Sequence, residues 1–321
     1  MTMLPVKAAH TLPMIAPEHS WLIEELWGRD AVGIIGGEPK CCKSFLALDM
    51  AVSIASGLPC LGRFLPQQTG RVLLFAAEDA LPMVRARLEG ISTVFGTRLD
   101  ALDIQVITSP TLRLDLVPDR ESLLETVAVL KPRFLVLDPF VRLHRIDENA
   151  SAEVAPLLGH LRDIQREHRV AIAVVHHARK GGSRLREGQA LRGSSEFHAW
   201  GDSNLYLRRM GPDLILSMEH RAAASLGELR LELRTQDNKT ALRVLDSKAA
   251  CTESIPRPQT VLDRVQQALT DAPGPLTVDA LRTTCRIRTQ RLHEALRSLR
   301  NDGTITKTAR GYLLTTSSLS T

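Results

Sequence analysis

The sequence lacks the features of membrane-spanning, secreted and disulfide-stabilised proteins. Its five cysteines are odd in number and include no CxxC pair, which argues against a disulfide framework and against a zinc site. No apolar run approaches the ~20 residues of a membrane span, and no apolar signal-peptide core follows the N-terminus. We therefore expect a soluble cytoplasmic protein with reduced thiols.

The chain also lacks a strong net charge, because the formal total is only +5 over 321 residues. The charges are unevenly distributed, however. Residues 257–321 carry ten basic and five acidic side chains, whereas residues 1–256 carry 31 of each. The length predicts about two domains, and the basic excess at one end favours contact with nucleic acid there.

Short apolar runs alternate with amphipathic segments between residues 30 and 245. This alternation predicts an α/β fold in which helices cover both faces of a mostly parallel sheet. Four strand-like segments after residue 200 predict an antiparallel extension of that sheet. The expected strands are 31–35, 72–77, 104–108, 134–138 and 170–175, and the expected helices are 43–56, 82–95, 120–130 and 151–168.

The C-terminal part reads as a separate small domain. Two prolines in 249–259 indicate a linker. Residues 260–316 then predict a winged helix-turn-helix, with helices at 260–270, 278–284 and 288–300 and a hairpin after them. We expect its third helix to contact DNA; a solvated basic helix on a wing that binds a protein partner is the alternative. The basic residues concerned are Arg288, Arg291 and Arg297.

The strongest local motif runs from Gly37 to Ser44. It follows an apolar strand and opens a helix, which is the context of a P-loop that binds ATP. Lys43 is expected to reach the β- and γ-phosphates, and Ser44 to ligate Mg²⁺. Cys42 stands where the second glycine belongs, so its side chain either crowds the phosphates or requires strained dihedral angles. The expected phosphate-binding residues are Gly37, Glu38, Pro39, Lys40, Cys41, Cys42, Lys43 and Ser44.

Two acidic residues follow apolar strands further along. Asp138 ends the run 134–138 and is expected to help hold Mg²⁺, although aspartate at a strand end is also a common turn residue. Glu78 follows the strand 72–77, where a carboxylate is well placed to act as a general base; a helix cap is its alternative role.

Five motifs, GEPKCCKS, LLFAAED, LVLDPFVRLHRIDENAS, VVHHARKGG and GQALRGSSEF, occur in this order. Over about residues 20–245 the chain thereby resembles the RecA-like ATPases of the RepA-type hexameric replicative helicases. The resemblance implies a RecA-like P-loop domain at 1–248, with 1–20 as an N-terminal arm. It also implies ATP and Mg²⁺ as ligands and a homo-oligomer, a hexameric ring, that binds DNA.

The resemblance implies roles for single residues as well. Glu78 would polarise the attacking water, and Arg87 would pack on the adenine. Asp138 would hold magnesium through water. His177 would sense the γ-phosphate, with core packing an equal alternative, while His176 beside it is expected to be a core residue.

A basic, glycine-rich loop follows the two histidines. In such ring ATPases this region faces the central channel and contacts single-stranded DNA; an ordinary solvated loop is the alternative. Aromatic residues make up only 4% of the chain, so contact would be mainly to phosphates and salt-dependent. The residues concerned are Arg179, Lys180, Arg184, Arg186 and Arg192.

The chain departs from the family at one position. A trans-acting arginine is expected about ten residues after the glycine of RGSS, where this sequence has Asp202. Arg221 is a substitute candidate; without it the protein would lack a strong arginine finger and hydrolyse ATP slowly.

The sequence leaves two candidate functions. One is a DNA-dependent ATPase, a helicase or translocase in the replication of a mobile element. The other is an ATP-gated DNA-binding regulatory or partner-loading protein.

Overall fold

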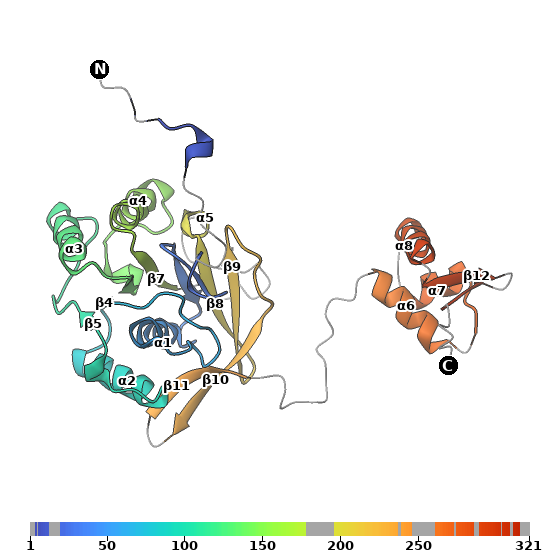
Figure 1. The fold of residues 1–321 in the computed structure, drawn as a ribbon, viewed down its shortest axis with the longest axis horizontal. Coiled ribbons are helices and arrows are strands. Elements are labelled where there is room, and N and C mark those ends of the chain that lie inside the picture. The colour runs from blue at the N-terminus through green and yellow to red at the C-terminus, as the bar shows by residue number, and fades with distance from the viewer. Residues whose placement is uncertain are drawn as a thin grey trace. The chain divides into compact units, whose positions relative to one another are not determined.

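The computed structural model describes residue 4 and residues 6–12, 20–177, 196–236, 239–245, 261–272, 274–285, 289–302, 304–308 and 311–314. The chain divides into two compact units, Met1–Asp246 and Ser247–Thr321. Figure 1 shows the ribbon of both units.

A nine-stranded sheet forms the centre of the first unit, in the order β11-β10-β9-β8-β3-β7-β6-β4-β5. The strands from β8 to β5 run parallel, and β9, β10 and β11 continue the sheet in antiparallel pairs. This confirms the expected α/β class with a mostly parallel sheet. The strands are β3 (Val32–Gly37), β4 (Val72–Ala76), β5 (Ile104–Val106), β6 (Phe134–Asp138), β7 (Ala171–His177), β8 (Ser203–Met210), β9 (Asp213–His220), β10 (Leu229–Gln236) and β11 (Lys239–Val244). A short antiparallel pair, β1 (Trp21–Ile23) and β2 (Trp27–Gly28), precedes them.

Helices cover both faces of this sheet. Buried side chains of α1 and α2 pack in one apolar cluster, whereas those of α3 and α4 pack in a second cluster on the other face. These helices lie on the two sides of the strands in Figure 1. The helices are α1 (Lys43–Ser56), α2 (Leu81–Val94), α3 (Val117–Leu130), α4 (Ser151–His168) and the short α5 (Glu196–Trp200).

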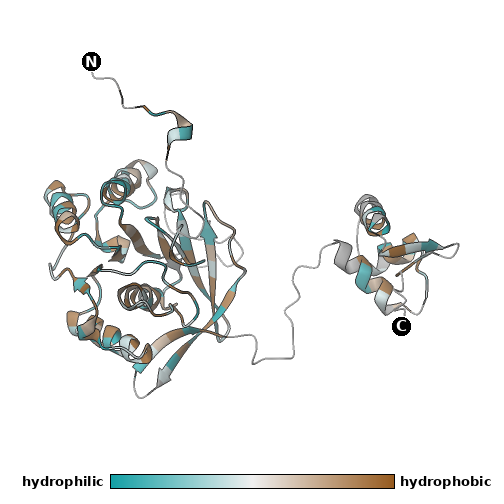
Figure 2. Cartoon of the chain, viewed as in Figure 1, coloured by the Kyte–Doolittle hydropathy of each residue, from teal (hydrophilic) through white to brown (hydrophobic). Residues whose placement is uncertain are grey.

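The strands are buried on both faces because their sequences are almost continuously apolar. All six residues of β3 are buried, and Figure 2 shows the hydrophobic residues gathered on the central strands. One boundary differs from the expectation. The helix predicted at 120–130 begins three residues earlier, since Pro118 occupies its first turn, where the missing N–H of proline breaks no helical hydrogen bond.

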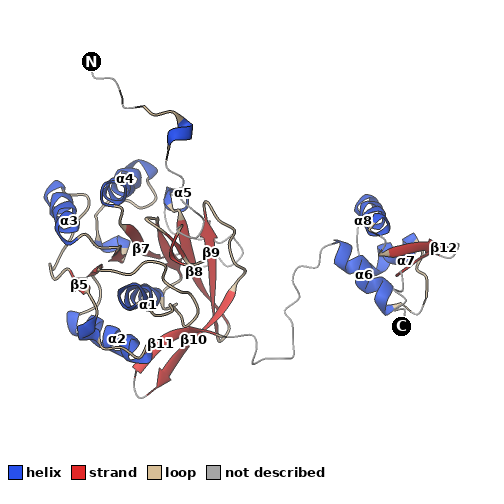
Figure 3. Cartoon of the chain, in the orientation of Figure 1, coloured by secondary structure: helices blue, strands red, loops and turns tan. Residues whose placement is uncertain are grey.

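In its described residues the second unit has three helices and a two-stranded sheet, and Figure 3 distinguishes helices from strands by colour. The elements are α6 (Val261–Asp271), α7 (Val278–Cys285), α8 (Thr289–Asn301), β12 (Ile305–Thr308) and β13 (Gly311–Leu314). Leucines from all three helices and Ile305 of β12 share one small core, which includes Leu269, Leu281 and Leu296. Helices and strands thus occur where the sequence predicts them. Their assignment as a DNA-binding winged helix stays a prediction.

Candidate functional site

The segment between β3 and α1 has two residues other than glycine with a positive φ. A Cβ added at Gly37 would lie 2.1 Å from the carbonyl oxygen of Leu207 on β8, so only glycine fits. Lys40 has φ 65° and Cys42 has φ 62° and ψ 24°. This left-handed conformation costs an L side chain about 1–2 kcal/mol. Cys42 therefore adopts a strained conformation that a glycine would adopt freely. Strained dihedral angles are one of the two alternatives that the sequence predicts for Cys42.

Lys43 is a buried cation whose hydrogen-bond acceptor, among the described residues, is a neutral carbonyl. Lys43 is only 5% exposed, and its Nζ donates a 2.7 Å hydrogen bond to the carbonyl oxygen of Glu38. Burial lowers the pKa of Lys43, because desolvation penalises the ammonium. A neutral carbonyl compensates a buried charge only in part. The arrangement therefore favours binding of an anion such as a phosphate at this point.

Asp138, at the end of β6, meets Ser44 at the start of α1. Burial raises the pKa of Asp138 to about 6. A hydrogen bond from the Ser44 side chain and the charge of Lys43 oppose that rise, while the charges of Asp79 and Glu78 add to it. A carboxylate beside a hydroxyl offers the oxygen ligands that Mg²⁺ prefers, and a divalent cation would relieve the crowding of three carboxylates. Ser44 and Asp138 therefore fit a magnesium ion.

These side chains surround a cavity of about 300 Å³. It brings together residues from the P-loop segment and from the ends of β4, β6 and β7, with α2 on one side. Gly37, the last residue of β3, and Glu38 and Pro39 after it do not line the cavity. The lining residues are Lys40, Cys41, Cys42, Lys43, Ser44, Phe45, Glu78, Arg87, Asp138, Val175 and His177.

Glu78, the expected general base, has a partner that the sequence did not single out. Nε of Arg142 donates a 3.1 Å hydrogen bond to Oε1 of Glu78. Arg142 ends the 3₁₀ turn Phe140–Arg142, which follows Asp138 almost directly. The only sequence signal for this contact is the position of Arg142 four residues after Asp138.

Arg87 lines the cavity and is held from two sides. Its guanidinium pairs with Asp79 and lies 5.3 Å from the centre of the Phe45 ring. Phe45 is a second residue that sequence reasoning missed, although it directly follows Ser44. An arginine held over an aromatic ring provides a flat surface of the kind that a nucleobase can stack on.

The two histidines at the end of β7 have different surroundings. His176 is 1% exposed and stacks on Phe197 of α5, with ring centres 4.3 Å apart and an interplanar angle of 23°. This confirms the expected core role of His176. His177, one residue later, lines the cavity instead.

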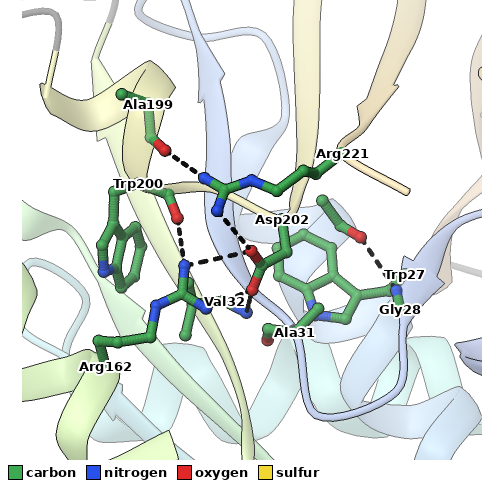
Figure 4. Close-up of polar contacts among 10 residues, drawn as sticks. Trp27, Gly28, Ala31, Val32, Arg162, Ala199, Trp200, Asp202 and Arg221 are labelled. Carbon is green, nitrogen blue, oxygen red and sulfur yellow. Dashed lines mark hydrogen bonds and ion pairs between the residues drawn. The ribbon is translucent and has the colours of Figure 1, made fainter. Parts of the chain in front are cut away.

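Neither Asp202 nor Arg221 lines this cavity, and Figure 4 shows the polar contacts that hold them. Asp202 pairs with Arg162 of α4 and with Arg221, and accepts a 3.3 Å hydrogen bond from the backbone N–H of Val32. Arg221 also donates to the carbonyl oxygen of Ala199. Val32 begins β3, so at ~3.3 Å per residue Asp202 is about 17 Å from the P-loop end of that strand. The structure therefore does not bring Arg221 to the cavity of its own chain, and its action on a neighbouring chain stays a prediction.

Most of the expected DNA-binding residues lie outside the residues that the structure describes. Arg291 is in α8, but its side chain is not described, whereas Arg297 is on the same helix and exposed. Contact with DNA stays a prediction for all of them. Those outside the described residues are Arg179, Lys180, Arg184, Arg186, Arg192 and Arg288.

Cys41, Cys42, Cys60 and Cys285, the cysteines of the described part, are all unbridged. Burial raises the pKa of both P-loop thiols, so neither is activated as a thiolate. Within the described residues, no three or more His, Cys, Asp or Glu side chains form a metal cluster. The described helices include none long and apolar enough to span a bilayer.

Comparison with known proteins gives two findings. The model of a family described as the AAA domain matches residues 3–183, which is more than half of the chain. Among solved structures, the crystal structure of the RadB recombinase is similar, with 17% sequence identity and a TM-score of 0.48. That similarity covers 66% of this chain and 90% of the RadB recombinase chain.

Proposed function

The chain belongs to the AAA domain family, and on this premise we propose that it is an oligomeric, DNA-dependent ATPase, a helicase or translocase in DNA replication of a mobile element. The observation that carries the proposal is the convergence of the P-loop lysine, a hydroxyl and two carboxylates at a single cavity. Lys43, Ser44, Glu78 and Asp138 come from three separate segments of the chain and all line it.

In this proposal Lys43 binds the phosphates of ATP and exchanges its bond to the Glu38 carbonyl for an anion. Ser44 and Asp138 hold Mg²⁺, which when bound neutralises charge on the phosphates. Arg87, over the ring of Phe45, receives the adenine.

The hydrolytic step is assigned to Glu78 and His177. Glu78 orients the attacking water and accepts its proton, and the hydrogen bond from Arg142 fixes the direction in which the Glu78 carboxylate points. His177 lies on the cavity wall at the end of β7, where an imidazole can donate to a γ-phosphate oxygen.

We further propose assembly into a hexameric ring in which Arg221 completes the site of the neighbouring chain. To reach out, Arg221 would exchange its contacts with Asp202 and Ala199 for contacts with phosphate. The basic loop at 179–192 would face the channel of the ring and bind the phosphates of single-stranded DNA.

The test is ATP hydrolysis with and without single-stranded DNA, combined with native mass in the presence and absence of MgATP. We expect DNA to stimulate hydrolysis, MgATP to favour a six-subunit mass, and the protein to displace a strand from a duplex. The proposal fails if single-stranded DNA does not stimulate hydrolysis and no strand is displaced.

A second function is favoured by two observations. They are the left-handed backbone at Cys42 and the use of Asp202 inside the chain, at the position where the resemblance to the RepA-type helicases implies an arginine. In this alternative hydrolysis is slow, and nucleotide controls assembly of a DNA-binding regulatory or partner-loading protein. Fast turnover that DNA stimulates, with unwinding, would reject it.

We propose that α8 directs either activity to a DNA site. Arg297 is exposed on this helix, while Arg282 on α7 is exposed but pairs with Asp279 and is a matched control. Arg297→Ala should weaken DNA binding and lower the salt slope by about one ion, because one phosphate contact is lost. Arg282→Ala should change neither. If both variants bind DNA like the wild type, a surface for a protein partner is the better assignment.

A further inference from the structure

Arg209 stands near the end of β8, the strand that flanks the P-loop strand. β8 runs parallel to β3, and Leu207 is the register partner of Gly37, the first residue of the P-loop motif. Side chains alternate along a strand, so Arg209 shares a face with Leu205 and Leu207. Both leucines pack in the cluster that contains α1. Arg209 therefore extends from the face of the sheet on which the P-loop and its helix lie.

The neighbouring Arg208 differs from Arg209 in the face of the sheet that it occupies and in its polar contacts. Arg208 is on the opposite face and bonds Glu228. In the part of the chain that the structure describes, by contrast, no hydrogen bond or ion pair engages the Arg209 guanidinium, and its side chain is exposed. Arg209 is therefore a cation on the P-loop face of β8 whose donors none of the described residues engages.

The strand register sets the level of Arg209 along the sheet. Leu207 lies level with Gly37, the last residue of β3, so Arg209 lies two residues further along, about 7 Å past that level in the direction in which the P-loop leaves the strand. The charge of Arg209 also offsets a small part of the rise that burial causes in the pKa of the Cys41 thiol in that loop.

We propose that Arg209 is a phosphate-binding residue that acts in cis, donating to the phosphate oxygens of the nucleotide held by the P-loop of its own chain. The proposal rests on the proposed nucleotide site and adds β8 to it. A guanidinium offers paired donors that match phosphate oxygens. It would supply positive charge to the phosphates from within the chain.

A residue that acts in cis has a distinguishing property. Its contribution to nucleotide affinity is present in each chain and does not depend on assembly, whereas an arginine donated by a neighbour contributes only when chains associate. The effect of removing Arg209 should therefore be the same at protein concentrations below and above assembly.

The test is the Kd of the Mg²⁺ complex of a non-hydrolysable ATP analogue for the full chain and three variants. Arg209→Ala should raise Kd about tenfold or more, as loss of a charge-assisted hydrogen bond does. Arg209→Lys should recover part of the affinity, and Arg208→Ala, the matched control on the same strand, should stay within about twofold of wild type.

Three results would overturn the inference. If Arg209→Ala binds the analogue as tightly as wild type, only the role of Arg209 is refuted and the nucleotide site stands. An equal loss in Arg208→Ala refutes it too, because damage to the strand would then explain both. If the wild type does not bind the analogue, the proposed nucleotide site fails and this inference with it.

Discussion

Asp49→Asn should remove a large part of the pH dependence of stability of the first unit. Asp49 lies in the middle of α1 and is fully buried. Its Oδ1 accepts a 2.7 Å hydrogen bond from the N–H of Leu61 and one from Sγ of Cys60, while Oδ2 has no hydrogen-bond partner in the described part of the chain. Burial raises the pKa of Asp49 to about 7, and the hydrogen bonds from Leu61 and Cys60, followed by the positive charge of Arg243, offset this only in part.

The direction in which stability changes with pH follows from the number of protons that the folded and unfolded states bind. The ordinary pKa is 3.8, so between about pH 4 and pH 7 the folded protein holds a proton that the unfolded chain has lost. Asp49 therefore contributes stability that is fully present below about pH 4 and is lost as the pH rises to about 7. At ~1.4 kcal/mol per pKa unit, the total change is on the order of 4 kcal/mol. Asparagine stays neutral and lacks this dependence.

The assay is denaturant unfolding followed by tryptophan fluorescence. Trp21, Trp27 and Trp200 are the three tryptophans of the sequence, and all belong to the first unit, so the signal reports that unit alone. Between pH 5 and pH 8 the wild type should lose about 3 kcal/mol more free energy of unfolding than Asp49→Asn. Parallel pH profiles for the two proteins would refute the reasoning, because Asp49 would then titrate alike in both states.

Three further changes test the site and its support. Glu78→Gln should bind MgATP within a few-fold of wild type but hydrolyse it about 100-fold more slowly or worse, as loss of a general base does; near-normal turnover would remove Glu78 from that role. Cys42→Gly should raise turnover, because glycine adopts the left-handed backbone freely and leaves more room for phosphate; an unchanged rate would show that the side chain does not obstruct the loop. Arg162→Met keeps the apolar stem but leaves Asp202 without its main partner, so the first unit should lose about 1–3 kcal/mol in denaturant unfolding. If the free energy of unfolding falls by less than about 0.5 kcal/mol, hydration of Asp202 compensates for loss of the Arg162–Asp202 pair.

Local pattern was sufficient to predict the sheet and most of the cavity. Near-continuous apolar runs such as β3 and β6 identify strands covered on both faces, and parallel strands place Glu78, Asp138 and His177 at one edge. The P-loop motif could then be placed beside them. Each of these inferences depends only on the spacing of residues within a segment.

Contacts between distant segments were not predictable in this way. The hydrogen bond from Val32 to Asp202 joins residues 170 positions apart, and the approach of Arg209 to the P-loop depends on β8 pairing with β3. Alternation along the strand could show that Arg208 and Arg209 point to opposite faces. It could not show which face carries α1, because that depends on the order of strands in the sheet.

The most direct test of the central claim is binding and hydrolysis of MgATP by the wild type and by Lys43→Ala. The cavity is built around a buried ammonium that donates a hydrogen bond to a neutral carbonyl and faces the charges of Asp138 and Glu78, so the claim depends on that charge. We predict that the wild type binds and hydrolyses MgATP and that Lys43→Ala does neither measurably. Equal affinity and equal hydrolysis in the two proteins would contradict the assignment of this cavity as the nucleotide site.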